Sequence, residues 1–204
     1  MDNLHTIKEL LSRIIYKSYL PKSYFSIDDA ILNKSTKIFE KDYLRWYDNT
    51  NIDINKLFLT PQLISVLCYR ISRELFLKSQ LSNNQQIGGG NEEYAYSLLG
   101  RQIGLTEIFF SAEIGEGLKI NHGGGTVIGA RCKIGNNCTI HQGCTIGDRK
   151  GGRPVIGNNV MIYAGSLILG DINIGDNSVI GANSVVIHSC PPGSVLIGSP
   201  SLSI

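Results

Sequence analysis

The chain has 204 residues, with 19 Lys and Arg against 17 Asp and Glu, so its formal net charge is only +2. This near-balance, without any run of five or more basic residues, argues against a nucleic-acid partner. No stretch approaches the roughly 20 apolar residues that span a bilayer, and the N-terminal segment lacks the apolar core of a signal peptide. The five cysteines, an odd number, fit reduced thiols better than a disulfide framework. We therefore expect a cytoplasmic protein with no membrane span.

The first half of the sequence predicts a helical N-terminal domain over residues 1–104. Apolar residues recur at helical spacing from Ile7 to Ile15, with charged residues between them. A buried helix is expected from Pro61, because Thr60 is a suitable N-cap and proline fits the first helical position. Further helical segments are expected as short pieces around the aromatic residues of 19–58 and, after a break at Gly88, Gly89 and Gly90, over 92–102.

The second half changes to a repeat of six residues. Its repeated aliphatic positions are Ile114, Ile120, Ile128, Ile134, Ile140, Ile146, Ile156, Ile162, Ile168, Ile174, Ile180 and Val186. A period of six fits neither a helix nor a plain sheet; it is typical of a hexapeptide β-helix, in which three hexads make one triangular coil. A generic β-sandwich would not keep this register. We expect an α+β protein by composition, in which residues 105–198 form a parallel β-helix of about four coils.

Several motifs in this repeat resemble one family. They are Tyr69-Arg70-Ile71, Asn121-His122 followed by Gly123-Gly124-Gly125, Thr145-Ile146-Gly147, Ala164-Gly165, and the closing Pro191-Pro192-Gly193 with Gly198-Ser199-Pro200. The chain is thereby similar to the serine acetyltransferase branch of the hexapeptide-repeat acyltransferases, whose β-helix is left-handed. The resemblance implies acetyl-CoA as co-substrate and a homotrimer or dimer of trimers with active sites between neighbouring β-helices.

The candidate base for acyl transfer is His122. It lies at the first of two breaks in the repeat, where two extra residues follow Ile120 and a side chain can leave the regular wall. An unperturbed imidazole titrates near 6.5, which suits proton abstraction at neutral pH. The resemblance implies that a carboxylate about fifteen residues earlier orients this imidazole. Glu107 occupies that position, where the family usually has Asp, so His122 and Glu107 are the predicted catalytic pair.

The second break, four extra residues after Ile146, produces a glycine-rich cationic segment. Extra residues in a regular repeat usually form loops on the binding face. The resemblance places the coenzyme A arm beside Gly147 and Ala164-Gly165, and basic residues of the loop could meet its phosphates. The predicted cofactor-binding residues are Gly147, Asp148, Arg149, Lys150, Ala164 and Gly165.

The acceptor site departs from the serine-specific pattern. Asn121 stands where serine-specific members have Asp, and Arg153 stands where their second His lies. A neutral and a cationic residue there should repel an ammonium and favour a sugar or glycan-related hydroxyl. His141 and Asp48 complete the expected acceptor residues, with Asp48 able to hold an ammonium instead. Two alternatives stay open: L-serine as the acceptor, and a non-catalytic β-helix scaffold, against which the retained His122 argues.

Three further predictions concern side chains outside this site. Cys132, Cys138 and Cys144 are expected to be packed thiols. No metal site is predicted, because His141 and His188 lack the triple-His spacing of a β-helical zinc enzyme. The C-terminal tail, 199–204, is too short to reach a pocket on a partner, so binding of a cysteine synthase through Ile204 is not expected.

Overall fold

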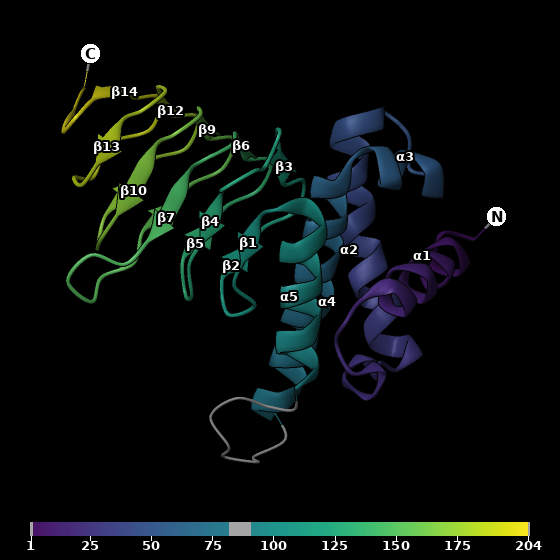
Figure 1. Ribbon diagram of the computed structural model, residues 1–204. Helices are drawn as coiled ribbons and strands as arrows, with labels where there is room; N and C mark the ends of the chain where they lie inside the picture. Colours follow the sequence, from purple (N-terminus) through teal and green to yellow (C-terminus); the bar gives the residue numbers. More distant parts are fainter. Residues whose placement is uncertain (1, 82–90, 204) are drawn as a thin grey trace.

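The structure, a computed structural model, describes residues 2–81 and 91–203 and consists of a helical bundle followed by a triangular β-prism (Figure 1). The glycines at 88–90 and the terminal Ile204, both named in the sequence predictions, lie outside these residues. Within the described ranges, no helix is long and apolar enough to cross a membrane.

A central helix, α4, organises the helical bundle. The helical elements are α1 (Asn3–Lys17), the 3-10 turn η1 (Lys22–Phe25), α2 (Asp29–Tyr47), α3 (Ile54–Leu59), α4 (Pro61–Leu81) and α5 (Glu92–Gly104). As predicted, α4 begins at Pro61, and every residue from 63 to 72 is buried. Both α2 and α5 pack along α4, so this helix joins the bundle to the prism.

The prediction of short helical pieces over 19–58 is wrong for α2, which is one continuous helix of 19 residues. Its N-cap is Asp28, whose carboxylate accepts the N–H of Ile31 at 2.8 Å. Its buried face includes the polar residues Ser35, Thr36 and Asp42. These polar residues interrupt the apolar periodicity by which an amphipathic helix is identified in a sequence.

The prism has three sheets whose strands are parallel except for β15, and each complete coil contributes one strand to each sheet. Sheet A contains β1 (Glu107–Ile108), β4 (Val127–Ile128), β7 (Thr145–Gly147), β10 (Leu167–Leu169) and β13 (Val185–Val186). Sheet B contains β2 (Glu113–Ile114), β5 (Lys133–Ile134), β8 (Val155–Ile156) and β11 (Asn173–Ile174). Sheet C contains β3 (Lys119–Ile120), β6 (Thr139–Ile140), β9 (Met161–Ile162), β12 (Val179–Ile180), β14 (Val195–Gly198) and β15 (Ser201–Ser203).

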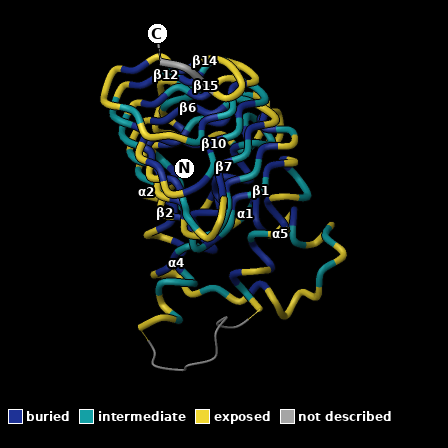
Figure 2. The backbone as a smooth tube through the Cα atoms, turned by 90° about the vertical axis from the view of Figure 1, so that its left-hand side faces the viewer, coloured by how far each residue is buried: buried dark blue, intermediate teal, exposed yellow. Residues whose placement is uncertain are grey.

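The repeated aliphatic residues fill the interior of the prism. Ile120, Ile140, Ile162 and Ile180 are paired in register along sheet C, and none of them is exposed. Figure 2, which shows the C-terminal end of the prism, displays this buried interior inside stacked coils. The predicted left-handed parallel β-helix of about four coils is confirmed.

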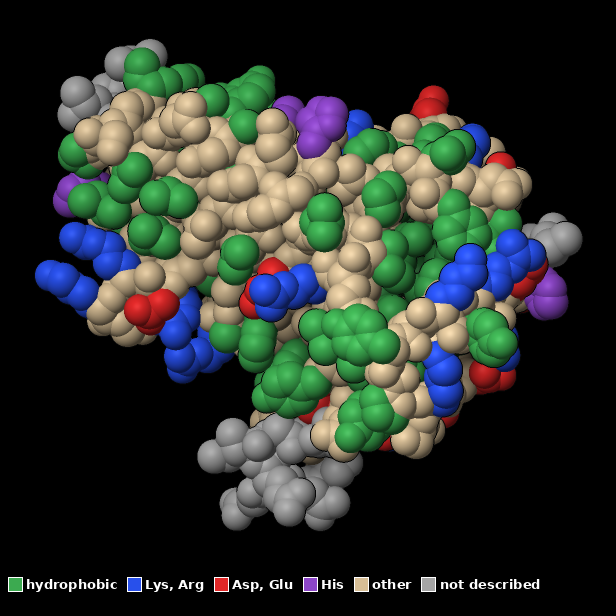
Figure 3. All heavy atoms as spheres, viewed as in Figure 1, with side chains coloured by type: hydrophobic (Ala, Val, Ile, Leu, Met, Phe, Trp, Pro, Cys, Tyr) green, Lys and Arg blue, Asp and Glu red, His purple; other side chains and the backbone are tan. Residues whose placement is uncertain are grey.

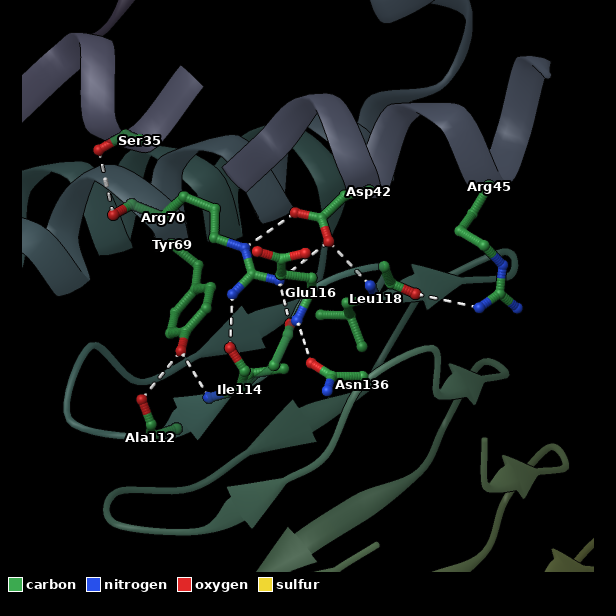
Figure 4. Close-up of polar contacts among 12 residues, drawn as sticks. Ser35, Asp42, Arg45, Tyr69, Arg70, Ala112, Ile114, Glu116, Leu118 and Asn136 are labelled. Carbon is green, nitrogen blue, oxygen red and sulfur yellow. Dashed lines mark hydrogen bonds and ion pairs between the residues drawn. The ribbon is translucent and has the colours of Figure 1, made fainter. Parts of the chain in front are cut away.

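Polar side chains of the helical bundle cover the open edge of the first coil (Figure 4). Asp42 and Arg70 form a fully buried ion pair, with Nε and Oδ2 2.8 Å apart. Arg70 also donates to the carbonyl of Ile114 at 2.7 Å, and Asp42 accepts the N–H of Leu118 at 2.8 Å. The hydroxyl of Tyr69 accepts the N–H of Ile114 at 3.1 Å. Backbone groups that would otherwise form an unpaired strand edge are thereby satisfied.

The other end of the prism is closed differently. The strand β15 turns back and pairs antiparallel with β14, with Gly198 opposite Ser201 and Leu196 opposite Ser203. The last parallel strand of sheet C therefore has a partner on both sides.

Candidate active site

The turn that follows β3 contains a bulge of two residues, His122 and Gly123. Gly143, in the corresponding turn of the next coil, donates its N–H to the carbonyl of Gly124 at 3.0 Å, so the two turns are stacked in register from Gly124 onward. This register leaves His122 and Gly123 outside the stack. Both adopt left-handed backbone conformations, with φ of 63° and 68°, and the His122 side chain is exposed. As expected, the side chain at the register break, that of His122, lies outside the regular wall of the prism.

Residues outside the turn itself fasten this bulge. The amide Nε2 of Gln62, at the start of α4, donates to the carbonyl oxygen of His122 at 2.9 Å. The hydroxyl of Thr106 donates to the carbonyl of Gly123 at 3.0 Å. A Cβ on Gly123 would lie 2.5 Å from Thr106 Oγ1 and 2.8 Å from Gln62 Cγ, so the close approach of these side chains requires glycine. The sequence analysis did not identify Gln62 or Thr106.

A column of three side chains runs up the prism beside the bulge. The residues Asn121, His141 and Tyr163 follow β3, β6 and β9 at equivalent positions. Asn121 Nδ2 lies 3.3 Å from His141 Nε2, and the rings of His141 and Tyr163 stack with centroids 5.1 Å apart. Burial, together with repulsion from His122, lowers the pKa of His141 below its ordinary value. A neutral imidazole therefore lies beside the predicted base.

Glu107, the predicted orienting carboxylate, lies in β1 at the edge of sheet A. Its Oε2 forms an ion pair with Arg101 of α5 at 3.1 Å. Among the described residues, no hydrogen bond joins Glu107 to the His122 imidazole. The carboxylate is thus held by the helical bundle.

The loop after β7 is held mainly by its own residues. Asp148 forms an ion pair with Arg153, and Arg149 and Gly152 exchange two main-chain hydrogen bonds of 3.3 and 3.1 Å. The Arg153 guanidinium also donates through Nε to the carbonyl of Ala130 at 3.0 Å. The exposed side chains of Arg149 and Lys150 border a cleft of about 460 Å³. The loop therefore presents two cations, whereas the charge of Arg153 is balanced by Asp148.

The predicted site residues fall at two different corners of the prism. The bulge with Asn121, His141 and the Ala164-Gly165 turn lies where sheet C passes into sheet A, and the basic loop lies where sheet A passes into sheet B. Figure 3 shows histidine side chains along the upper edge of the prism and a cluster of Lys and Arg at its lower edge. Asp48 lies apart from both groups as the exposed C-cap of α2. One chain alone does not bring the base and the basic loop together.

The three predicted structural cysteines are packed inside the prism. Cys132, Cys138 and Cys144 are free thiols with no exposed surface, which confirms that expectation. Burial raises the pKa of each thiol, so these residues are inert rather than nucleophilic. Over residues 2–81 and 91–203, no group of three or more His, Cys, Asp or Glu is placed to hold a metal ion.

Comparison with known proteins relates this geometry to a family. The model of the bacterial transferase hexapeptide (six repeats) matches residues 153–188. A serine acetyltransferase of Helicobacter pylori (strain ATCC 700392 / 26695) is 40% identical over 152 residues, which cover 72% of this chain and 84% of that protein. This chain belongs to the serine acetyltransferase family. The resemblance inferred from the motifs is confirmed.

Two further comparisons agree with this assignment. A serine acetyltransferase of Staphylococcus aureus (strain Mu50) is 47% identical over 110 residues, which cover 52% of each protein. The solved structure of Neisseria gonorrhoeae serine acetyltransferase in complex with serine is similar with a TM-score of 0.70 and 25% identity, covering 100% of this chain and 97% of that one. The expected enzyme class is confirmed: this member of the serine acetyltransferase family is an acyltransferase that uses acetyl-CoA as co-substrate, not a scaffold alone.

Proposed function

We propose that this enzyme is a serine O-acetyltransferase that acts in the cytoplasm, with His122 as its general base. The observation that carries the proposal is the 40% identity with the Helicobacter pylori serine acetyltransferase, which extends over 84% of that protein. The described thiols of the chain are all free, which suits a reducing compartment.

The reaction proceeds by direct transfer. The imidazole of His122 takes the proton of the serine hydroxyl, and the hydroxyl oxygen attacks the thioester carbonyl carbon. A tetrahedral oxyanion forms, for which main-chain N–H groups are the available donors. The carbon–sulfur bond then breaks, and coenzyme A leaves as its thiol after taking the proton from the imidazolium. We propose no acyl-enzyme, because none of the described Cys or Ser side chains is hydrogen-bonded to a histidine ring or a carboxylate that could activate it.

The charge argument for a saccharide acceptor weakens once the Arg153 side chain is located. That argument requires a free cation beside the base, but Asp148 balances the charge of Arg153. Asn121 is then the remaining change of charge at the acceptor site, and a neutral amide can still hydrogen-bond an ammonium. The family relationship therefore favours L-serine over a sugar hydroxyl.

The complete site is expected to need two chains. In the described part of the chain, the turn that carries His122 contains no Lys or Arg, and the loop that carries Arg149 and Lys150 contains no histidine. A trimer, or a dimer of trimers, would place the first corner of one copy beside the second corner of the next. Gly147, where an added Cβ would meet no atom within 4 Å, leaves bare backbone for the pantetheine arm beside the loop.

The deciding experiment is an acceptor panel. Thiol release from acetyl-CoA is followed with L-serine, L-homoserine, amino sugars and oligosaccharides, and the product is identified by mass spectrometry. We expect kcat/KM for L-serine of about 10⁴ M⁻¹s⁻¹ or higher. Efficient turnover of a saccharide with little activity on serine would instead restore the saccharide acceptor. Light scattering tests the assembly. The shared site is tested by mixing His122→Ala with an Arg149→Ala/Lys150→Ala variant, which should give a kcat/KM for acetyl-CoA above the mean of the two separate variants.

The role of the C-terminus is tested separately. A ten-residue C-terminal peptide that ends in Ile204 is titrated against a cysteine synthase by calorimetry. No micromolar binding is expected, because the main chain of Ser201–Ser203 is paired with β14.

A further inference from the structure

We infer that Gln62 is a positioning residue that holds the base in place. The inference rests on the proposed role of His122 and adds a residue from the helical bundle to the same site. Gln62 is the second residue of α4, and its amide nitrogen donates to the His122 carbonyl oxygen at 2.9 Å.

The conformation of His122 explains why it needs such a contact. A residue with a Cβ is disfavoured in the left-handed region, and His122 has φ of 63°. Gly123 follows at 68°, so two successive residues depart from the regular chain path. The carbonyl between them is the group that Gln62 fixes, and a hydrogen bond there sets the plane of the peptide from which the imidazole projects.

The second polar atom of Gln62 supports a dedicated role. Its Oε1 is shielded from solvent, and the described part of the chain offers it no hydrogen-bond partner. A buried acceptor without a partner lowers folding stability, so an apolar side chain of equal length would serve packing better. The presence of a glutamine at this position is therefore better explained by the contact with His122 than by the stability of the bundle.

The helix that carries Gln62 is itself firmly anchored. Eight residues further along α4, the Arg70 guanidinium is buried in its ion pair with Asp42 and bonded to the first coil. Gln62 therefore approaches His122 from a helix that is fixed to the same coil at a second point (Figure 4 shows the Arg70 end). This double attachment lets the helical bundle determine where the base lies.

The test separates positioning from stability. Gln62→Met keeps the length of the side chain and removes both polar atoms. We expect kcat for L-serine acetylation to fall about tenfold or more, because small displacements of a catalytic group are costly. KM for acetyl-CoA should stay unchanged, and the melting temperature should stay equal or rise. The matched control is Gln102→Met on α5, which removes a surface hydrogen bond to Tyr19 and should keep wild-type kcat.

A second variant, Gln62→Glu, keeps the proposal testable if Gln62→Met does not fold. Gln62→Glu cannot donate to the His122 carbonyl and places a negative charge near the imidazole, so it should lower kcat and shift the acid limb of the pH–rate profile toward higher pH. His122→Ala is measured in parallel. Wild-type kcat in both Gln62 variants, with His122→Ala inactive, would overturn the positioning role and leave the proposed base intact. Full activity of His122→Ala would overturn both.

Discussion

The two breaks in the six-residue repeat are built in opposite ways. The bulge after β3 is fastened from outside its own turn, by Gln62 of α4 on the carbonyl of His122 and by Thr106 on that of Gly123. The loop after β7 is closed mainly by its own Asp148–Arg153 ion pair and leaves Arg149 and Lys150 exposed. A base must be fixed to within a fraction of an ångström, whereas side chains that meet phosphates need only present charge. The anchoring of each irregularity therefore matches the chemistry proposed for it.

The largest effect is expected from removing the proposed base at the anchored break. His122→Ala should reduce kcat by 10²–10⁴-fold, because general base catalysis contributes a factor of that size. The fold and the affinity for acetyl-CoA should remain, since the imidazole is exposed. Steady-state kinetics, circular dichroism and calorimetric titration with acetyl-CoA measure the three quantities. A variant that keeps more than about a tenth of wild-type kcat would remove His122 from the mechanism.

A smaller loss is expected from Glu107→Gln, about ten- to a hundredfold in kcat. The change removes a charge that could stabilise the imidazolium but leaves the base in place. The matched control is Glu113→Gln, in the same coil as Glu107, which breaks an exposed ion pair with Lys133. Equal activity of the two variants would show that Glu107 has no role beyond its pair with Arg101.

A pair of glycine substitutions compares the two breaks directly. Gly123→Ala places a Cβ against Thr106 and Gln62, so it should lower kcat at least about tenfold and destabilise the protein by more than the ~1–2 kcal/mol of left-handed strain. Gly151→Ala has a similar positive φ of 85° but meets no atom within 4 Å, so only the strain should appear. Thermal denaturation and kcat are measured for both. Similar kinetics for the two variants would contradict the difference in anchoring.

Substitutions in the loop after β7 should affect the binding of acetyl-CoA rather than the chemical step. Arg149→Ala/Lys150→Ala should raise KM for acetyl-CoA about tenfold with little change in kcat, since charged hydrogen bonds to phosphate are lost. High salt should reduce the difference from wild type by screening. Lys37→Ala/Lys41→Ala removes the same charge from the exposed side of α2 and serves as the control. An unchanged KM would exclude the loop as the phosphate contact.

The smallest effect concerns His141. Its pKa is lowered by burial and by repulsion from His122, so the unfolded chain binds a proton there before the folded protein does. Stability should therefore fall slightly as the pH drops below 6.5, and His141→Gln should remove that part of the slope. Imidazole NMR titration should give a midpoint below 6.5 for His141. A midpoint above 6.5 would contradict this prediction, because protonation of His141 would then stabilise the folded protein instead of destabilising it.

The β-helix was predictable because its signal is local. Each coil repeats the same aliphatic position, so Ile120, Ile140 and Ile162 could be assigned to the interior from spacing alone. The same counting located His122 at a register break, and the one-coil separation from His141 explains why both lie on one edge.

The contacts that fasten the site were not predictable, because they join residues far apart in the sequence. Gln62 lies 60 positions before His122, and nothing in its own neighbourhood marks its partner. Asp42 and Arg70 belong to α2 and α4 and meet only when the two helices pack. The pairing of Asp148 with Arg153 did have a signal, since opposite charges flank a short closed loop.

The unlike ends of the prism have a consequence for how the chain can change in evolution. The described contacts of the helical cap are with the first coils, and the antiparallel β15 pairs with β14. Between them, each coil contacts its neighbours alone, as in other solenoids. Whole coils beyond the third could therefore be duplicated or deleted while His122, the basic loop and both closures stay unaltered. The length of the prism can thus change in evolution without a change in the residues of the proposed site.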